Sequence, residues 1–594
     1  MDVDPGNRLA FCFLAGWCNR CYEVPVFAVL LVPLLPLLTA LMVAVGDDAS
    51  RRVRTQLAAF PIGTAFLGAI VTLYIVATQG PISIRFYDPT SIASLTFPIG
   101  FYIDRLSAVM MVLISGVGTV IYAYSIGYMY QDPHEPRYLS LIGVATFVLL
   151  CMVSSANLMM LFLFWQLLSY LLYLLAHNHS HAATLHGAFR TFTVLRIGDV
   201  AFLAGVVLAH SLYGTLEFQD LFTRAAASSV TLSPLPGWEV SGPTAVTLLL
   251  FIGGMSKSAQ FPLHFWLPRS LYAPTPVHAL LHAGIINAGG FLINRLAPLF
   301  GLSPTTLHVA FVVGTLTAIL GATMMLAQND IKKTLGFSTI GQMGYMIMEC
   351  GLGAFSLAVF HLIAHGLFKG TVFLNCGNVI HKARQEPQVP HVDRHEEEEL
   401  FSPLTWSTGF VTTLVIPLVI LLVTHGILRI PLLESQGTVI FLFFIWLTSS
   451  QAILTLTRLR AIASWKVSSA MLLTLLFVVF VYLFAVESFT AFLYPNPAEV
   501  ASYFQAADLP NWIFDGLVLM ATIMTVLSWC YLYMQAHGRT IWLPKWVSRL
   551  IEGGRNGLYV LFMNRLYADE LYQQSGRTVM RIFHRFDKRD RGWS

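Results

Sequence analysis

The sequence is dominated by apolar segments whose lengths match the thickness of a lipid bilayer. About 20 apolar residues in a helix cross the hydrocarbon core, and about fifteen such segments occur here. Backbone polar groups in lipid must bond within their own segment, which favours helices. Charged residues make up 11% of the chain, against roughly 25% in soluble domains. We therefore predict an all-α polytopic membrane protein. The segments lie near residues 24–44, 57–78, 106–127, 139–153, 157–176, 190–211, 244–264, 274–297, 306–327, 334–351, 354–379, 404–428, 437–457, 466–488 and 512–534.

The loops between these segments carry positive charge on alternate sides. Because Lys and Arg stay on the cytoplasmic side, the pattern predicts a multi-pass protein of the cell inner (cytoplasmic) membrane, with its N-terminus outside and its C-terminus in the cytoplasm. The net charge of +4 reflects this topology, and we expect no nucleic acid partner. The basic tail is expected to lie on membrane lipid as an amphipathic helix. The orienting cations before that tail are Arg51, Arg52, Arg54, Arg137, Arg269, Lys332, Lys333, Lys382, Arg384, Arg458 and Arg460.

The stretch from residue 253 to residue 290 places ionisable side chains where apolar ones are expected. Lys257 follows an apolar run and precedes Pro262, which disturbs a helix. A charge at the bilayer centre costs about 2.5 to 3.5 kcal/mol on insertion scales, so an intramembrane lysine indicates function. Interrupted helices in membranes line cavities or water paths. We predict an ion or proton path at Lys257; the alternative is a lysine that reaches the headgroups from a helix end.

Histidines recur at a spacing that aligns them on helix faces. His278 and His282 are four residues apart, and so are His361, His365 and Lys369, so each set shares one face. Imidazole titrates near physiological pH, which suits a proton relay. Zinc binding and hydrogen bonds to backbone carbonyls are the alternatives, although the acidic or cysteine ligands of a zinc site are absent nearby. The predicted proton or cation path, without a metal, is Lys257, His278, His282, His361, His365 and Lys369.

Several stretches carry a family resemblance. SKSAQFPLHFWLP, APTPVHALLHAG, DIKKTLGFSTIGQMGYM and HLIAHGLFKGTVFLNCGNVIH resemble signature stretches of the antiporter-like membrane subunits of respiratory complex I and of multisubunit sodium/proton antiporters. The resemblance implies two inverted five-helix repeats, each with a discontinuous helix, an architecture used for ion sites at the membrane midplane. It divides the chain into N-terminal transmembrane helices (1–135), an antiporter-like core with both repeats (136–460), C-terminal transmembrane helices (461–534) and a cytoplasmic amphipathic basic tail (535–594).

The chain departs from this family's pattern at three places. Gln166 stands where the family's pumps carry a glutamate, and Arg269 stands where they show an aspartate. Their second interrupted helix usually contains a lysine, whereas residues 417–431 offer His425 and Arg429. Unlike a glutamate, Gln166 brings no charge to Lys257. We expect supporting roles beside the path for Gln166, Arg196, Asp199, Lys332 and His425.

With these departures, the pattern is most similar to the membrane subunit of the DAB-type inorganic carbon accumulation system. In that family the membrane subunit pairs with a large cytoplasmic zinc protein similar to a β-carbonic anhydrase, and the pair hydrates CO2 to bicarbonate. The resemblance implies a chain that conducts protons or sodium ions and has no cofactor or catalytic chemistry of its own. Two alternatives stay open: a proton-translocating subunit of an NADH-quinone oxidoreductase or cation/proton antiporter, and a membrane anchor whose polar stripe only stabilises the bundle.

Overall fold

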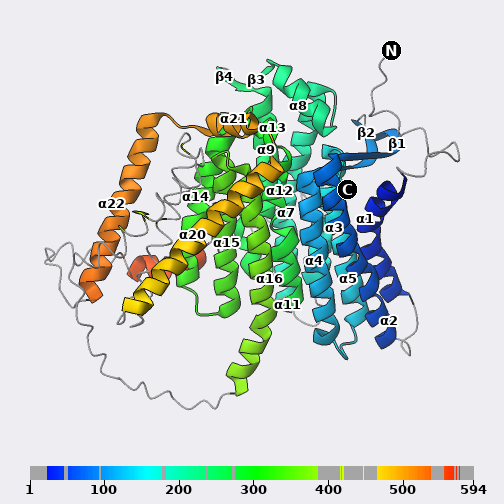
Figure 1. The fold of residues 1–594 in the computed structure, drawn as a ribbon, viewed down its shortest axis with the longest axis horizontal. Helices are drawn as coiled ribbons and strands as arrows, with labels where there is room; N and C mark the ends of the chain where they lie inside the picture. Colours follow the sequence, from blue (N-terminus) through cyan, green and yellow to red (C-terminus); the bar gives the residue numbers. More distant parts are fainter. Residues whose placement is uncertain are drawn as a thin grey trace, which may run out of the picture.

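Long helices running side by side form the body of the computed structural model (Figure 1). It describes residues 23–45, 51–92, 95–176, 182–235, 237–270, 274–385 and 465–536, with parts of 415–446 and 554–574. Within these residues, eight helices are long and apolar enough to cross a membrane, or nine if the bent pair α21 and α22 is one span. The predicted segments coincide with described helices, except those at 404–428 and 437–457, of which only a few residues are described.

The first helices pack against one another at one side of the body, before the chain enters the central part. The long helices of the central part, α14, α15 and α16, are followed by α20, which crosses them at an angle (Figure 1). The helices are α1 (Glu23–Ala44), α2 (Arg51–Leu57), α3 (Ala59–Gln79), α4 (Arg105–Tyr128), α5 (Glu135–Val153), α6 (Leu158–Ala176), α7 (Ala182–Tyr213), α8 (Phe218–Ala227), α9 (Gly242–Lys257), α10 (Leu267–Ser270), α11 (Thr275–Leu280), α12 (Ala288–Arg295), α13 (Ala297–Phe300), α14 (Pro304–Leu326), α15 (Ile331–Gly351), α16 (Phe355–Gln385), α20 (Trp465–Leu493), α21 (Pro497–Ala507) and α22 (Asn511–Ala536).

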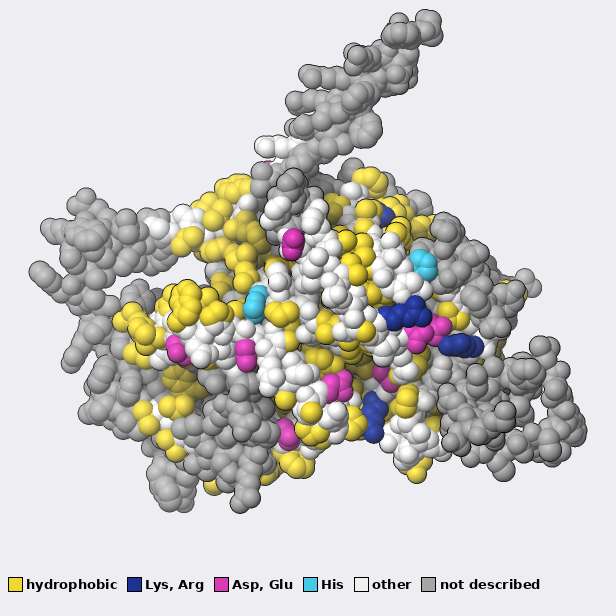
Figure 2. Space-filling model, turned by 90° about the horizontal axis from the view of Figure 1, so that it is seen from above, with side chains coloured by type: hydrophobic (Ala, Val, Ile, Leu, Met, Phe, Trp, Pro, Cys, Tyr) yellow, Lys and Arg dark blue, Asp and Glu magenta, His cyan; other side chains and the backbone are white. Residues whose placement is uncertain are grey.

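Two short hairpins, which the sequence analysis did not predict, lie at one end of the bundle. Antiparallel strands β1 (Ile82–Ile92) and β2 (Leu95–Ile103) form the first, and β3 (Thr231–Leu235) and β4 (Trp238–Ser241) the second. They share this end with α8, α13 and α21 (Figure 1), and we call it the hairpin face. Figure 2 looks onto it and shows acidic and basic side chains scattered among apolar and uncharged ones.

The opposite end of the bundle carries the basic helix α2, of sequence RRVRTQL. This distribution of charge agrees with the orientation expected from the loops, in which the α2 end is cytoplasmic. The orientation itself stays a prediction.

Helices interrupted near the middle of the chain position the site. Helix α9 ends at Lys257, and the chain resumes as a 3-10 turn (Leu263–Trp266) before α10. Helices α11 and α12 are separated by a π-helical turn (Leu281–Ile285) that contains His282; such turns are frequent at functional sites. The discontinuity expected at Pro262 is thus present. The second interrupted helix, expected around 417–431, lies outside the described residues.

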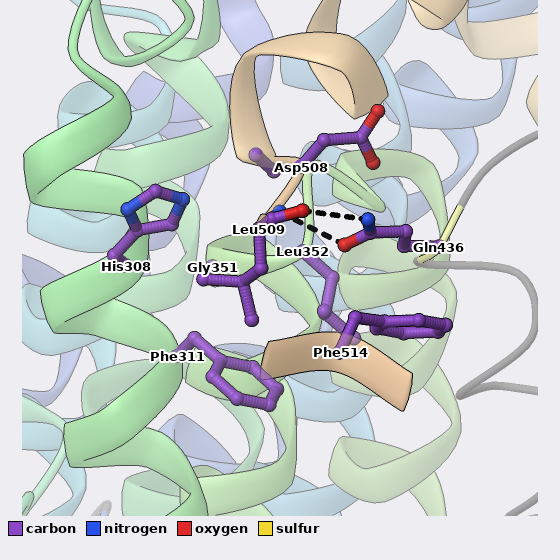
Figure 3. Close-up of a pocket in the computed structure, with 9 residues that line it drawn as sticks. His308, Phe311, Gly351, Leu352, Gln436, Asp508, Leu509 and Phe514 are labelled. Carbon is purple, nitrogen blue, oxygen red and sulfur yellow. Dashed lines mark hydrogen bonds between the residues drawn. The ribbon is translucent and has the colours of Figure 1, made fainter. Parts of the chain in front are cut away.

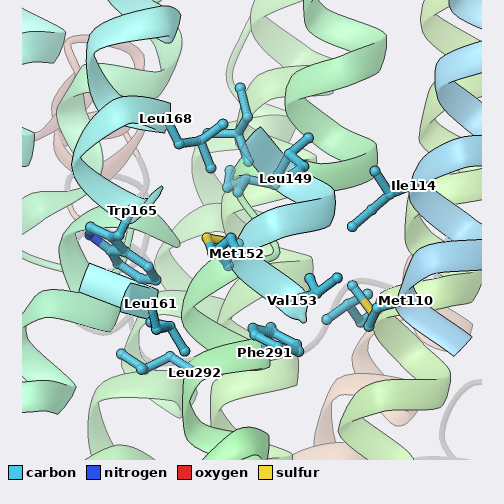
Figure 4. Packing of buried hydrophobic residues seen from close by; sticks show 14 of the residues in the cluster. Met110, Ile114, Leu149, Met152, Val153, Leu161, Trp165, Leu168, Phe291 and Leu292 are labelled. Carbon is cyan, nitrogen blue, oxygen red and sulfur yellow. The ribbon is translucent and has the colours of Figure 1, made fainter. Parts of the chain in front are cut away.

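Close packing holds these broken helices in place. Small residues bring the backbones of α14 and α15 together, because Gly321 lies against Gly341 and Gly344 lies against Ala318. A buried apolar cluster also joins α4, α5, α6 and α12 (Figure 4). Trp165 of α6 belongs to this cluster and is fully buried, so the core fixes the side chain that the site uses.

Candidate functional site

Lys257 is fully buried at the last residue of α9. Its Nζ donates hydrogen bonds to the Trp165 carbonyl oxygen at 2.7 Å and to Ser169 Oγ at 2.6 Å. The ammonium also lies 4.5 Å from the centroid of the Trp165 ring, a cation–π contact. Neutral oxygens and an indole therefore surround the amine, and it makes no direct ion pair among the described residues.

A carboxylate reaches Lys257 through those same neighbours. Asp199 Oδ1 accepts a hydrogen bond from Trp165 Nε1 at 2.8 Å, and Oδ2 lies 3.5 Å from Ser169 Oγ. Arg196 pairs with Asp199 at 2.8 Å and also donates a hydrogen bond to Gln166 Oε1. The structure therefore gathers the expected supporting residues Gln166, Arg196 and Asp199 beside Lys257, and balances the carboxylate's charge with an arginine.

Polar groups line the break that follows Lys257. Ser258 Oγ donates to the Ile286 carbonyl oxygen at 2.6 Å, which ties this break to the π-helical turn. From that turn, Asn287 Nδ2 donates to the His282 carbonyl oxygen at 3.0 Å. Gln260, also fully buried, donates to the Ser258 carbonyl oxygen at 2.9 Å. Buried polar side chains thus lie both at the break after Lys257 and beside the turn that contains His282.

Two of the predicted histidines stack on one phenylalanine, and a third histidine lies against one of them. Phe373 of α16 stacks on His282 with ring centroids 4.4 Å apart and on His278 with centroids 5.7 Å apart. His282 and His365 lie edge to face at 6.1 Å. Among the described residues, neither ring nitrogen of His282 or of His365 has a hydrogen-bond partner, so these nitrogens are available to accept and release protons.

We call the row of ionisable side chains that begins at Lys257 the line, and it continues along the contact between α15 and α16. His361 and His365 have ring centroids 6.4 Å apart. His361 Nδ1 lies 3.1 Å from a Glu349 carboxylate oxygen, and its Nε2 lies 3.0 Å from Gln342 Oε1. Farther along, Lys369 Nζ donates to Ser338 Oγ at 2.7 Å. The sequence marks Gln342 as a residue for hydrogen bonds between helices but not as part of the path, and Glu349 was missed, although a lone carboxylate within an apolar segment was a signal for it.

The remaining predicted residues lie away from this line or outside the described residues. Lys332 is in the first turn of α15, at the end opposite Glu349, and His425 lies outside the described residues. Across the described part of the chain, no group of three or more His, Cys, Asp or Glu side chains is arranged to hold a metal ion. The expectation that this chain carries no cofactor stays a prediction.

A small cavity at the end of α15 contains none of the predicted path residues. Gln436 donates to the Leu509 carbonyl oxygen at 2.7 Å and accepts from its amide at 2.8 Å (Figure 3). The lining residues are His308, Phe311, Gly351, Leu352, Gln436, Ala507, Asp508, Leu509 and Phe514.

The chain is similar to known families, relatives and solved structures. Residues 155–422 match the family NADH:quinone oxidoreductase/Mrp antiporter, TM, and residues 90–139 match NADH-Ubiquinone oxidoreductase (complex I), chain 5 N-terminus. A structural neighbour, in the Mrp complex of Dietzia sp. DQ12-45-1b, superposes with a TM-score of 0.57 at 19% identity, over 94% of this chain and 60% of that chain. This likeness shows that the chain has the antiporter-like subunit fold.

Two relatives show how far the sequence similarity extends. The NADH-quinone oxidoreductase subunit L of Neisseria meningitidis serogroup A is 35% identical over 55% of this chain and 49% of the relative. The probable inorganic carbon transporter subunit DabB1 of Halothiobacillus neapolitanus is 38% identical over 94% of this chain and 98% of the relative. Because the second similarity spans both proteins nearly end to end, the chain belongs to the DabB family of inorganic carbon transporter membrane subunits, within the wider family of complex I and Mrp antiporter-like subunits.

Proposed function

We propose that this chain is the cation-conducting membrane subunit of a two-component inorganic carbon uptake complex. In this proposal it couples the proton motive force to a large cytoplasmic zinc-containing subunit similar to a β-carbonic anhydrase. Hydration of CO2 yields bicarbonate and one proton, so a membrane path that moves protons under gated access gives that reaction its direction. The membrane chain supplies the path, and the zinc chemistry belongs to the partner.

The observation that carries the proposal is the buried line of ionisable side chains from Lys257 through His282 and His365 to His361. Such groups are costly in a membrane and occur where ions or protons pass. The steps from His282 to His365 and from His365 to His361 join neighbouring rings, and the step from Lys257 to His282 crosses the polar break after α9. A purely structural bundle gains nothing from leaving four imidazole nitrogens of His282 and His365 without partners.

The proposal also fixes an orientation in the cell inner membrane. The hairpin face lies outside the cell, and the basic α2 end lies in the cytoplasm, because cationic loops stay on the cytoplasmic side. The partner then meets the chain at the α2 end, and protons enter at the hairpin face and flow down their gradient.

Uptake of radiolabelled bicarbonate tests the coupling. We expect cells that express the chain with its partner to accumulate label, and we expect a protonophore to reduce the accumulation to background. The Lys257→Ala variant should assemble with the partner and accumulate no label. Uptake that survives the protonophore would contradict coupling to the proton gradient.

Affinity purification of the tagged chain in mild detergent tests the partner and the main alternative. We expect one large co-purifying protein with bound zinc, identified by mass spectrometry and a zinc assay. A set of flavin and iron–sulfur subunits would instead identify a respiratory oxidoreductase and overturn the proposal.

A further inference from the structure

A stripe of polar side chains on α15 faces the histidine stripe of α16. The two helices are antiparallel neighbours, and Ser338 on α15 meets Lys369 while Gln342 and Glu349 meet His361. The carboxylate stands at the end of this seam, near the last residue of α15 and therefore near the hairpin face. The line of ionisable groups thus ends in a carboxylate that belongs to a different helix from the histidines.

Both ring nitrogens of His361 lie beside acceptor oxygens. Gln342 Oε1 is an acceptor, so the ring nitrogen Nε2 that contacts it at 3.0 Å is a donor. A carboxylate oxygen of Glu349 is likewise an acceptor for Nδ1 at 3.1 Å. An imidazole that donates from both nitrogens is the imidazolium cation, so these two acceptor groups are placed to stabilise a protonated His361 beside the carboxylate. The arrangement is therefore one that holds an extra proton.

We propose that Glu349 and His361 form the outer port of the path, at the hairpin face, and that the ion taken up there is a proton rather than Na+. The inference rests on the proposed function and deepens it, because it names the residues that take up the ion and gives the reason why they select a proton. Glu349 is the proton acceptor at the port, and Gln342 is a positioning residue that holds the imidazole ring.

The port transfers protons without gaining or losing charge over one cycle. A proton binds the Glu349 carboxylate and moves to Nδ1 of a neutral His361 that carries its ring proton on Nε2, which forms the imidazolium. The imidazolium then loses its Nε2 proton toward His365, whose ring centroid is 6.4 Å away. One proton has entered and one has left, which leaves His361 neutral with its proton on Nδ1. A half-turn of the ring then brings the bare Nε2 to the carboxylate for the next proton.

The same groups fit a sodium ion poorly. Sodium is bound by several oxygen ligands, such as unwound backbone carbonyls in transporters. The described side chains around His361 offer the carboxylate of Glu349 and the amide oxygen of Gln342, and both already bond to the imidazole. Among the described residues, Tyr345 and Cys350 of α15 and Tyr482 of α20 are further titratable groups within electrostatic reach of the carboxylate, and none of them supplies a full negative charge at neutral pH.

The surroundings of Glu349 agree with a port at this face. Gly351 and Leu352, which follow Glu349 at the end of α15, line the small cavity shown in Figure 3 together with His308 and Asp508. The side chains of Glu349 and His361 are 14% and 17% exposed, whereas Lys257 is fully buried. The carboxylate is therefore the more accessible end of the line.

Ion flux into liposomes that contain the full chain purified with its partner tests the port. Proton uptake is followed with a pH-sensitive dye and sodium uptake with a radioactive tracer, each driven by a potassium diffusion potential. Glu349→Gln keeps the shape but exchanges no proton, so we expect proton flux to fall by about 100-fold, the lower range for loss of a proton-transfer group. Glu349→Asp keeps a carboxylate, and we expect flux within about tenfold of the wild type.

A matched control and distinct outcomes separate this inference from the proposed function. Glu499 lies on α21 at the same face and bonds to Tyr503 at 2.6 Å, so Glu499→Gln should conduct protons at the wild-type rate. A Glu349→Gln protein that conducts protons as well as the wild type overturns the port alone. Flux of sodium in place of protons overturns the identity of the ion, and a wild type that conducts neither ion overturns the proposed function as well.

Discussion

The two ends of the buried line compensate their charge in different ways. At one end, Lys257 contacts only neutral oxygens and the Trp165 ring, and the Asp199 carboxylate reaches it through Trp165 and Ser169. At the other end, the Glu349 carboxylate contacts the His361 imidazole directly. Gln166, where related pumps carry a glutamate, belongs to the Lys257 end and bonds to Arg196.

This difference indicates a division of labour along the line. A charge in direct contact with a counter-ion is held more strongly than one without, because separation leaves both partners uncompensated. A charge held by hydroxyl, carbonyl and indole groups has no counter-ion from which it must be separated. The Lys257 end is therefore suited to gain and lose its proton during a cycle, whereas the Glu349 end is suited to capture one from outside. Variants that exchange these properties test the comparison.

Replacing Lys257 by methionine should have the largest effect on proton flux. Methionine keeps the length and fills the buried space but carries no proton, so we expect proton flux and bicarbonate uptake to fall to background, about 100-fold or more. The matched control, Lys333→Met, removes a lysine from the first turn of α15, away from the line. Normal uptake by Lys257→Met, with normal assembly, would favour a membrane anchor over a conducting subunit.

Interrupting the line at His365 should have the next largest effect on proton flux. His365 links His282 to His361 and has no hydrogen-bond partner on either nitrogen among the described residues. His365→Gln preserves polarity but cannot carry a proton, and we expect flux to fall about tenfold or more. His210→Gln, in the last turn of α7 and away from the line, is the control. Equal flux in both variants would show that protons bypass His365.

Much of the line could be predicted from the sequence, because it depends on spacing within one helix. His278 and His282, like His361, His365 and Lys369, share a face through the four-residue spacing alone. Residues paired across helices follow a different rule. Ser169 meets Lys257 from a helix distant in the sequence, and such pairing depends on tertiary packing that no local pattern encodes.

Glu349 shows the intermediate case. It precedes the short turn between α15 and α16, and antiparallel packing of these two helices brings it to His361. A search for charged residues on both sides of each short turn would have found it. The hairpins β1–β2 and β3–β4 were missed because a search for membrane-length apolar segments ignores the loops in which they form.

Restoring the family's glutamate at position 166 should have a moderate effect. A carboxylate in Gln166→Glu would compete with Asp199 for Arg196, which now bonds to both residues. Asp199, less neutralised, would hold the ammonium of Lys257 more strongly and slow proton release. We expect flux to fall about fivefold, the equivalent of about 1 kcal/mol for a partly exposed pair. Faster flux than the wild type would show that a direct carboxylate at this end favours conduction.

An ion pair outside the line should affect stability rather than flux. Arg295, at the end of α12, bonds to Asp104 at 2.7 Å, and Asp104 caps α4 by accepting from the Ser107 amide at 2.9 Å. Burial tends to raise the pKa of the Asp104 carboxyl, but Arg295 and the hydrogen bonds outweigh it and lower the pKa below its ordinary value. The pair therefore stabilises the fold above that ordinary pKa, and the stabilisation is lost as the pH falls through the lowered value.

Asp104→Asn keeps a capping side chain but leaves the Arg295 charge unpaired, and Arg295 is 4% exposed. We expect thermal stability in detergent at pH 7 to fall by on the order of 2 kcal/mol, less than for a fully buried pair, with proton flux within about twofold of the wild type. The difference in melting temperature should shrink in acid, where the wild-type carboxyl is also protonated. The double variant Asp104→Asn with Arg295→Met should recover part of the loss, because neither charge then stays unpaired. A large fall in flux at unchanged stability would instead place Asp104 in the conduction path and extend the line beyond Glu349.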